Sequence, residues 1–304
     1  MSISEKLNAA AVAGKIAPGG AAMDSERPVH YKTAMDQGSS ALKVVIVGTG
    51  TIGRAVAKAV QTDAELKLVA AVDISDAARQ NAGEDFTGVT ITDDVEQIAE
   101  ADIAIVTAGR KLDRIAPTLR QLMAKKVRVV SDCAELVWPW LRHPHLSDVL
   151  ANEATKAGVA IVGTGTHPGV LSATLPLLLA STFGKVRRVA IKRTISLDTA
   201  RPSVKRQAGL GLTSDQFRKL ATDGVVGLPG TGESVVLIAQ GLGRHPMRAE
   251  VRTAIRPMIE NDRVAGVAQH SAWRSTAWRL TSKRPPRSAK RPRRIRSKSL
   301  ATER

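Results

Sequence analysis

The sequence has few of the residues that stabilise small secreted folds or that anchor a chain in a membrane. It contains one cysteine, Cys133, which excludes a disulfide framework and a multi-cysteine metal site. The most apolar run, residues 171–180, is interrupted by Pro176 and is far shorter than the ~20 residues that span a bilayer. The N-terminus lacks the basic segment and long apolar segment of a signal peptide. We therefore expect a cytoplasmic protein without a metal site.

Aromatic residues are also scarce, at 3% of the chain, although hydrophobic residues make up 43%. The core must therefore consist mainly of Val, Ile, Leu and Ala, which suits a parallel sheet that is buried on both faces. At 304 residues, the chain is long enough for two domains of roughly 100–200 residues each.

The net charge of +17 is distributed unevenly. The stretch from Trp273 to Arg304 holds twelve Lys and Arg residues against one acid, Glu303, so it carries +11 of the total. Because the basic charge belongs mostly to this tail, the rest of the chain does not have the charge of a nucleic-acid-binding domain, and a nucleic-acid partner is not expected.

The basic tail, 273–304, has two interpretations. Clustered Lys and Arg bind phosphate without sequence information, so it could be an arm that contacts nucleic acid. The interpretation that we favour is a frameshift. Residues 279–284 can be encoded by codons that, read one base earlier, give Val-Asp-Leu-Glu-Ala. In that sequence apolar and acidic residues alternate, as they do in a half-buried strand. At the other end, residues 1–40 are rich in Ala, Gly and Ser, and we expect a flexible extension.

Short apolar runs alternate with helical patterns through the first half of the chain. We expect strands at 42–47, 66–72, 102–107, 127–130 and 159–162, and helices at 54–62, 115–124 and 147–157. This alternation implies right-handed crossovers. The sequence therefore predicts an α/β fold, with a Rossmann doubly wound parallel sheet over residues 41–164.

The pattern changes beyond this point, and residues 165–272 are expected to form a second α+β domain for substrate binding and dimerisation. Residues 183–196 are predicted to be a long strand because they partly alternate. Helices are expected at 213–221, with Thr213 as N-cap, and at 233–241.

A glycine-rich loop follows the first expected strand. Gly48, Gly50 and Gly53 have the G-x-G-x-x-G spacing, which permits a tight turn, close approach of a pyrophosphate and close packing of helix on strand. The helix N-terminus then offers N–H donors to the phosphates. The predicted cofactor-binding loop consists of Gly48, Thr49, Gly50, Thr51, Ile52 and Gly53.

An acid and a run of small residues close two neighbouring strands. Asp73 lies 20 residues after Gly53, where a carboxylate can bind both ribose hydroxyls, although it could instead cap a helix. The carboxylate would repel a 2′-phosphate and so favours NAD over NADP, whereas the nearby Arg79 weakens that preference. Thr107, Ala108 and Gly109 are expected to line the nicotinamide half of the cofactor, NAD or NADP.

Two loops hold the candidate catalytic residues. Glu135 precedes the apolar residues 136–138, and a carboxylate in such surroundings can act as acid or base; the alternative is a solvated loop residue. His167 lies in the Gly-rich turn 163–169 and could donate a hydrogen bond to substrate or be structural. Cys133 has no visible His partner and is expected to be a buried thiol rather than a nucleophile.

Several motifs in order resemble the 2,4-diaminopentanoate dehydrogenase family and the related native amine dehydrogenases, which have a dihydrodipicolinate-reductase-like N-terminal domain. The similarity runs from about Leu42 to Gln269. It rests on Gly48-Thr-Gly-Thr-Ile-Gly53, Cys133-Ala-Glu-Leu136 with Pro139, Gly163-Thr-Gly-Thr-His-Pro-Gly169, Arg193 with Asp198, Arg206-Gln-Ala-Gly-Leu-Gly211 before Phe217, and Val264-Ala-Gly-Val-Ala-Gln269.

This resemblance implies NAD(P)-dependent interconversion of a small amine and its ketone, with ammonia as co-substrate and a homodimer as the assembly. The family usually carries two glutamates where this chain has Ala134 and Glu135, so Glu135 becomes the candidate that binds the amine and moves its proton. The family often has Asn at the position of His167. Arg193 and Asp198 are expected to organise the site or the dimer.

Two other functions stay open at this point. One is a related reductase that acts on a cyclic imine or a semialdehyde. The other is a cofactor-binding protein with impaired catalysis.

Overall fold

The computed structural model describes residues 41–191, 196–227, 229–244 and 250–273. The predicted N-terminal extension, Arg193 and tail residues 274–304 lie outside these ranges. Within them, no helix combines the length and the apolar character that crossing a membrane requires.

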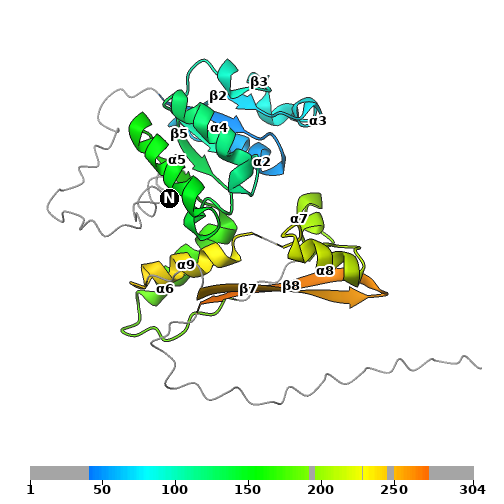
Figure 1. The fold of residues 1–304 in the computed structure, drawn as a ribbon. Coiled ribbons are helices and arrows are strands. Elements are labelled where there is room, and N and C mark those ends of the chain that lie inside the picture. Colours follow the sequence, from blue (N-terminus) through cyan, green and yellow to red (C-terminus); the bar gives the residue numbers. More distant parts are fainter. Residues whose placement is uncertain (1–40, 192–195, 228, 245–249, 274–304) are drawn as a thin grey trace, which may run out of the picture. The chain divides into compact units, whose positions relative to one another are not determined.

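The first half of the chain forms a six-stranded parallel sheet in the order β3-β2-β1-β4-β5-β6 (Figure 1). The strands are β1 (Leu42–Val47), β2 (Leu66–Val72), β3 (Thr90–Thr92), β4 (Ile103–Val106), β5 (Arg128–Ser131) and β6 (Ile161–Gly163). This order is that of the Rossmann fold, which confirms the predicted fold class. The short strand β3 has little apolar periodicity and was not predicted.

Helices connect these strands close to the predicted positions. They are α2 (Thr51–Gln61), α3 (Asp76–Gln80), α4 (Leu112–Ala124) and α5 (Pro144–Ala157), with short 3-10 turns η1 (Gly83–Phe86), η2 (Val95–Gln97) and η3 (Pro139–Leu141). Helix α4 begins three residues earlier than predicted, and α5 begins at Pro144, a residue that suits the first turn of a helix.

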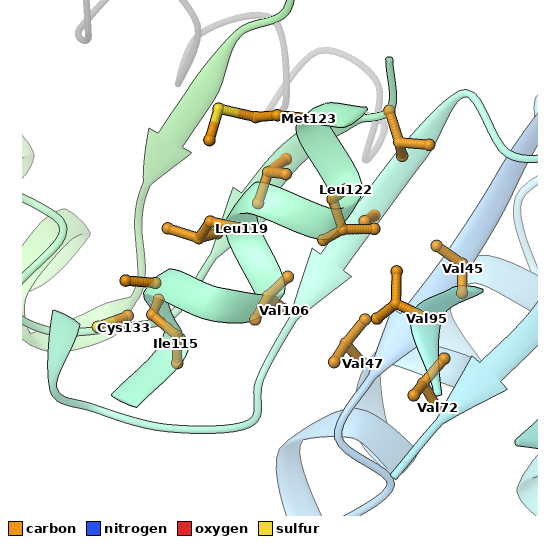
Figure 2. Close-up of a cluster of buried hydrophobic side chains, with 14 of the residues drawn as sticks. Val45, Val47, Val72, Val95, Val106, Ile115, Leu119, Leu122, Met123 and Cys133 are labelled. Carbon is orange, nitrogen blue, oxygen red and sulfur yellow. The ribbon is translucent and has the colours of Figure 1, made fainter. Parts of the chain in front are cut away.

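Both faces of the parallel sheet are covered, as the aliphatic composition predicts. Along β1, Val45 and Val47 contribute to one core cluster with α4 and α5, and most of its labelled members are aliphatic (Figure 2). The intervening Val44 and Ile46 pack on the opposite face against α2 and its surroundings. Alternate residues of a strand point to opposite faces, so a strand buried on both sides needs an unbroken apolar run.

The second half contains η4 (Thr166–Thr174), α6 (Leu175–Ala180), α7 (Pro202–Gln207), α8 (Ser214–Thr222), α9 (Thr231–Gly241), β7 (Val251–Glu260) and β8 (Arg263–Trp273). Strands β7 and β8 form an antiparallel hairpin around Asn261 and Asp262, which both have positive φ as a two-residue hairpin turn requires. Trp273 is the last residue of β8, so the hairpin takes in the first residue that the sequence assigned to the tail.

The prediction of a strand at 183–196 is wrong for its described residues, because 183–191 and 196 have no strand structure. A strand needs a neighbour for its backbone hydrogen bonds, and in the described second half the sheet consists of β7 and β8. The prediction for α8 is confirmed: Thr213 caps it, accepting a hydrogen bond from Gln216 N while the Gln216 side chain accepts one from Thr213 N.

Candidate active site

The register of the parallel sheet brings the predicted site residues to one edge. Val47 pairs with Val72 and Val106, Val106 pairs with Ser131, and Ser131 pairs with Gly163. The residues that follow these strand ends are Gly48, Asp73, Thr107, Asp132 and Thr164. Carboxyl ends of parallel strands are where doubly wound folds bind ligands.

The glycine-rich loop has the close contacts that its spacing predicts. Gly48 has φ +102°, and a Cβ on Gly53 would lie 1.8 Å from the Gly48 carbonyl oxygen. That oxygen is fixed, because Thr107 Oγ1 donates a hydrogen bond to it at 2.9 Å. A Cβ on Gly50, in contrast, would meet nothing within 4 Å. The loop therefore needs glycine at Gly53 for packing and leaves open space at Gly50.

The residues around this open space fit a dinucleotide. Helix α2 begins next to Gly50 with no side-chain cap, so its first N–H groups point to the space where a phosphate would bind. Asp73 Oδ2 accepts hydrogen bonds from Thr49 N at 2.7 Å and from Thr49 Oγ1 at 3.1 Å. Arg79 donates to the Asp73 carbonyl and pairs with Asp76. The carboxylate of Asp73 thus lies directly against the loop, beside an arginine that is already engaged by these two partners.

Thr107, Ala108 and Gly109 continue the same surface after β4. Thr107 N donates a hydrogen bond to Val47 O at 2.7 Å. A Cβ added to Gly48 would lie 2.9 Å from the backbone nitrogen of Ala108. Gly109 packs against Ile115 of α4. Residues 107–109 therefore place no large side chain beside the glycine-rich loop.

Glu135 is buried, so the alternative of a solvated loop residue is excluded. Its Oε2 accepts a hydrogen bond from Leu112 N, at the start of α4, at 2.8 Å. The same oxygen lies 2.9 Å from Nε2 of His143, and Oε1 lies 3.9 Å from Nε of Arg142. The carboxylate is therefore held in one place by a helix N-terminus and two basic side chains.

A second buried carboxylate, Glu233, was not predicted. Its side chain is 0% exposed, Arg142 Nε donates to its Oε1 at 2.5 Å, and Gly230 N donates to its Oε2 at 3.0 Å. Arg142 thereby joins Glu233 of α9 to Glu135 of the loop after β5. The sequence did contain one local signal for Glu233, a glutamate at the third position of a helix that follows a Gly-rich segment. Its arginine partner, however, lies 91 residues away in the chain.

The Gly-rich turn at 163–169 packs into the same region. A Cβ on Gly163 would lie 2.5 Å from the Leu136 carbonyl carbon, and one on Gly230 would lie 2.2 Å from Cδ of buried Pro168. His167 has a carbonyl that accepts a hydrogen bond from Arg110 Nη2 at 3.3 Å. The structure thus brings together the loop after β5, this turn and the start of α9.

Asp132 is a further titratable group at this edge that sequence reasoning missed. Burial raises the pKa of its carboxyl, and the charges of Arg110 and Arg201 offset part of that rise. Asp132 comes directly after β5, as Asp73 comes directly after β2, and this position could have indicated that it lies at the carboxyl edge of the sheet. The neighbouring Cys133 is buried, and burial raises the pKa of its thiol to about 12, so the thiolate is not available as a nucleophile.

Replacing Asp132 by asparagine should stabilise the protein at neutral pH. A raised folded-state pKa means that the charged carboxylate is less favourable in the folded protein, so Asp132 lowers stability once pH rises above its ordinary value of 3.8. The melting temperature of Asp132→Asn should exceed that of the wild type at pH 7, and the difference should disappear below that value. Asp113→Asn, at an exposed acid in the first turn of α4, removes a charge that the helix N-terminus favours, so it should instead lower stability by about 0.3–1 kcal/mol. A lower melting temperature for Asp132→Asn at pH 7 would contradict the assignment.

Comparisons with known proteins agree with the motif-based expectation. Residues 42–131 match the family model described as dihydrodipicolinate reductase, N-terminus. The chain is 24% identical over 230 residues to 2,4-diaminopentanoate dehydrogenase of Acetoanaerobium sticklandii, covering 72% of this chain and 64% of that protein, which is less than two thirds of its length. Its fold is similar to that of an amine dehydrogenase from Mycobacterium smegmatis, with TM-score 0.63, 19% identity, and coverage of 78% and 75% of the two chains. The predicted resemblance is confirmed: this chain is similar to 2,4-diaminopentanoate dehydrogenase, and residues 42–131 match the N-terminal family model of dihydrodipicolinate reductase.

Proposed function

We propose that the protein is an NAD(P)-dependent oxidoreductase that interconverts a small amine and the corresponding ketone, with ammonia as the nitrogen source in the reductive direction. The observation that carries this proposal is the position of buried Glu135, which follows β5 at the same sheet edge as the glycine-rich loop. A fixed carboxylate beside a dinucleotide can attract an ammonium group and take part in its proton transfer.

The cofactor would be held by the glycine-rich loop, Asp73 and residues 107–109, and it would supply hydride transfer at the carbon that bears nitrogen. Asp73 supports a preference for NAD, since its carboxylate lies against the loop where a 2′-phosphate would be repelled. Arg79 is engaged by the Asp73 carbonyl and by Asp76, which weakens its ability to bind that phosphate.

Glu135 and His167 are the proposed catalytic residues. Glu135 controls the proton at the substrate nitrogen, and its position is fixed by Leu112 N. His167 donates a hydrogen bond to the substrate from the turn that packs beside the loop after β5. In this proposal residues 41–164 bind the cofactor and residues 165–272 shape the substrate site.

We also propose that the second domain forms a homodimer in the cytoplasm. Large apolar side chains are exposed on α6 and just after it: Leu175, Leu178, Leu179 and Phe183 are 41–66% exposed. Contiguous exposed apolar side chains favour association with another protein surface. The single cysteine is buried, which suits a reducing compartment.

The proposal is tested by NADH and NADPH oxidation with ammonium chloride and a panel of small ketones. We expect turnover that requires ammonia and is faster with NADH than with NADPH. Turnover with a cyclic imine or a semialdehyde, and none with ketones and ammonia, would instead indicate an imine or semialdehyde reductase. Cofactor binding, measured by NADH fluorescence, without turnover on any substrate would indicate a cofactor-binding protein with impaired catalysis.

A further inference from the structure

Four charged or titratable side chains form a cluster where the loop after β5 meets α9. Glu135 and Glu233 are almost completely buried, with side chains 7% and 0% exposed. Arg142 lies between them and is 38% exposed, and His143, which the proposed mechanism does not use, is 28% exposed. In this cluster the carboxylates lie inside and the two basic side chains lie toward solvent.

The Oε2 atom of Glu135 is already engaged by protein groups, so this oxygen is poorly placed to take a proton from a substrate. It accepts from Leu112 N and lies 2.9 Å from His143 Nε2, and Arg142 lies beside Oε1. A carboxylate can accept a hydrogen bond but not donate one, so this contact holds the proton of His143 on Nε2. In that tautomer Nδ1 carries the lone pair, as in other carboxylate–histidine pairs in which the carboxylate orients the base.

His143 lies at the carboxyl edge of the parallel sheet, where the loop after β5 joins α5. It ends the loop that leaves the carboxyl edge after Ser131, and it is the N-cap residue of α5. Within this loop, Leu136 packs against Gly163. Leu141 packs against Gly232, because a Cβ added to Gly232 would lie 2.9 Å from Leu141 Cδ2. His143 therefore lies where the loop packs against the second Gly-rich turn and the start of α9.

We propose that His143 carries the proton that Glu135 controls at the substrate nitrogen: Glu135 attracts the ammonium group, orients the His143 ring and balances its charge. This inference rests on the proposed function. In the oxidative direction, an N–H bond of the ammonium substrate breaks and its electron pair stays on nitrogen. The proton bonds to Nδ1, and the resulting imidazolium is balanced by the Glu135 carboxylate. In the reductive direction the same proton returns to nitrogen.

The first arm of the test is activity of the full-length protein. His143→Ala should lower kcat by about 10²–10⁴-fold, the usual contribution of a general acid–base, while KM for NADH changes little. Added imidazole should restore part of that activity, which it would not do if the His143 side chain contributed only to folding. Glu135→Gln keeps a hydrogen-bond acceptor without the charge, so kcat should fall without rescue by imidazole. His145→Ala, two residues along the same helix, is the matched control and should behave as wild type.

The second arm does not depend on turnover. The ¹⁵N chemical shifts of the histidine rings, assigned with His143→Ala, should show the Nε2–H tautomer for His143 in the wild type and a mixture in Glu135→Leu. Three results would overturn the role of His143 while leaving the proposed function intact. They are an active wild type with an equally active His143→Ala variant, a loss of activity in His143→Ala that imidazole does not rescue, and an Nδ1–H tautomer of His143. An inactive wild type with bound NADH would overturn the proposed function and this inference together.

Discussion

Replacing Gly53 by alanine should strongly weaken dinucleotide binding and destabilise the half of the chain that contains the parallel sheet. The new Cβ would lie 1.8 Å from the Gly48 carbonyl oxygen and 2.9 Å from the Gly48 carbonyl carbon. These are backbone atoms, and Thr107 Oγ1 hydrogen-bonds to that oxygen, so the loop cannot move without losing this contact. Helix α2 must then shift away from β1, at a cost of about 1–3 kcal/mol or more. Affinity for NADH should fall by about 100-fold or more, because the loop and the helix N-terminus no longer have the required geometry.

Gly50→Ala is the matched control for this prediction. Gly50 has φ −68°, and its added Cβ would meet nothing within 4 Å, so the melting temperature without cofactor should change little. Affinity for NADH should still fall, because the methyl group would occupy the space that a pyrophosphate needs. Melting curves and NADH fluorescence titrations measure the two properties separately. Equal melting temperatures for Gly53→Ala and wild type would contradict the packing argument, and unchanged NADH affinity of Gly50→Ala would contradict the proposed location of the pyrophosphate.

The nucleotide-binding half was predictable because its signals are local. The apolar run of β1 and the glycine spacing after it are consecutive in the sequence, and each has a direct physical reading in strand burial and loop geometry. The parallel register then places Asp73 and Thr107 at the same edge without further information. The prediction of β2 matches residue for residue, since Leu66–Val72 is a continuous apolar segment apart from Lys67.

The charged cluster could not be predicted, because it depends on contacts between distant parts of the chain. Glu233 has the sequence context of an ordinary helix-start glutamate, and nothing near it indicates that its side chain is completely buried. The predicted strand at 183–196 failed for a related reason. Partial alternation is a local property, whereas strand formation depends on a partner strand, and no local pattern reports whether one is available.

Removing the guanidinium of Arg142 should strongly destabilise the cluster formed by Glu135, Arg142, His143 and Glu233. In Arg142→Met, Glu233 would remain fully buried and would keep the hydrogen bond from Gly230 N, and Glu135 would lose a neighbouring positive charge. Breaking a buried ion pair costs about 3–5 kcal/mol. Since Arg142 is 38% exposed and water can partly replace it, we expect a loss at the lower end of that range, about 3 kcal/mol. That corresponds to a melting temperature lower by roughly 6–12 °C for a folded unit of this size.

The double variant Arg142→Met/Glu233→Gln distinguishes an uncompensated charge from a simple loss of packing. The amide introduced in place of the Glu233 carboxylate would keep an oxygen for Gly230 N without leaving a buried negative charge. The double variant should therefore recover a large part of the stability that Arg142→Met loses. If packing of the arginine stem dominates instead, the double variant will be no more stable than the single one.

The size of the Arg142→Met effect also decides what holds the loop after β5 in place. An Arg142→Met variant within about 0.5 kcal/mol of wild type in urea unfolding would show that the cluster does not link the loop after β5 to α9. A strong effect would mean that Glu135, the carboxylate proposed to control the substrate proton, is held in position from α9 through Arg142 and Glu233. Packing of α9 against the loop would then position the proposed catalytic groups as well as shape the proposed substrate site.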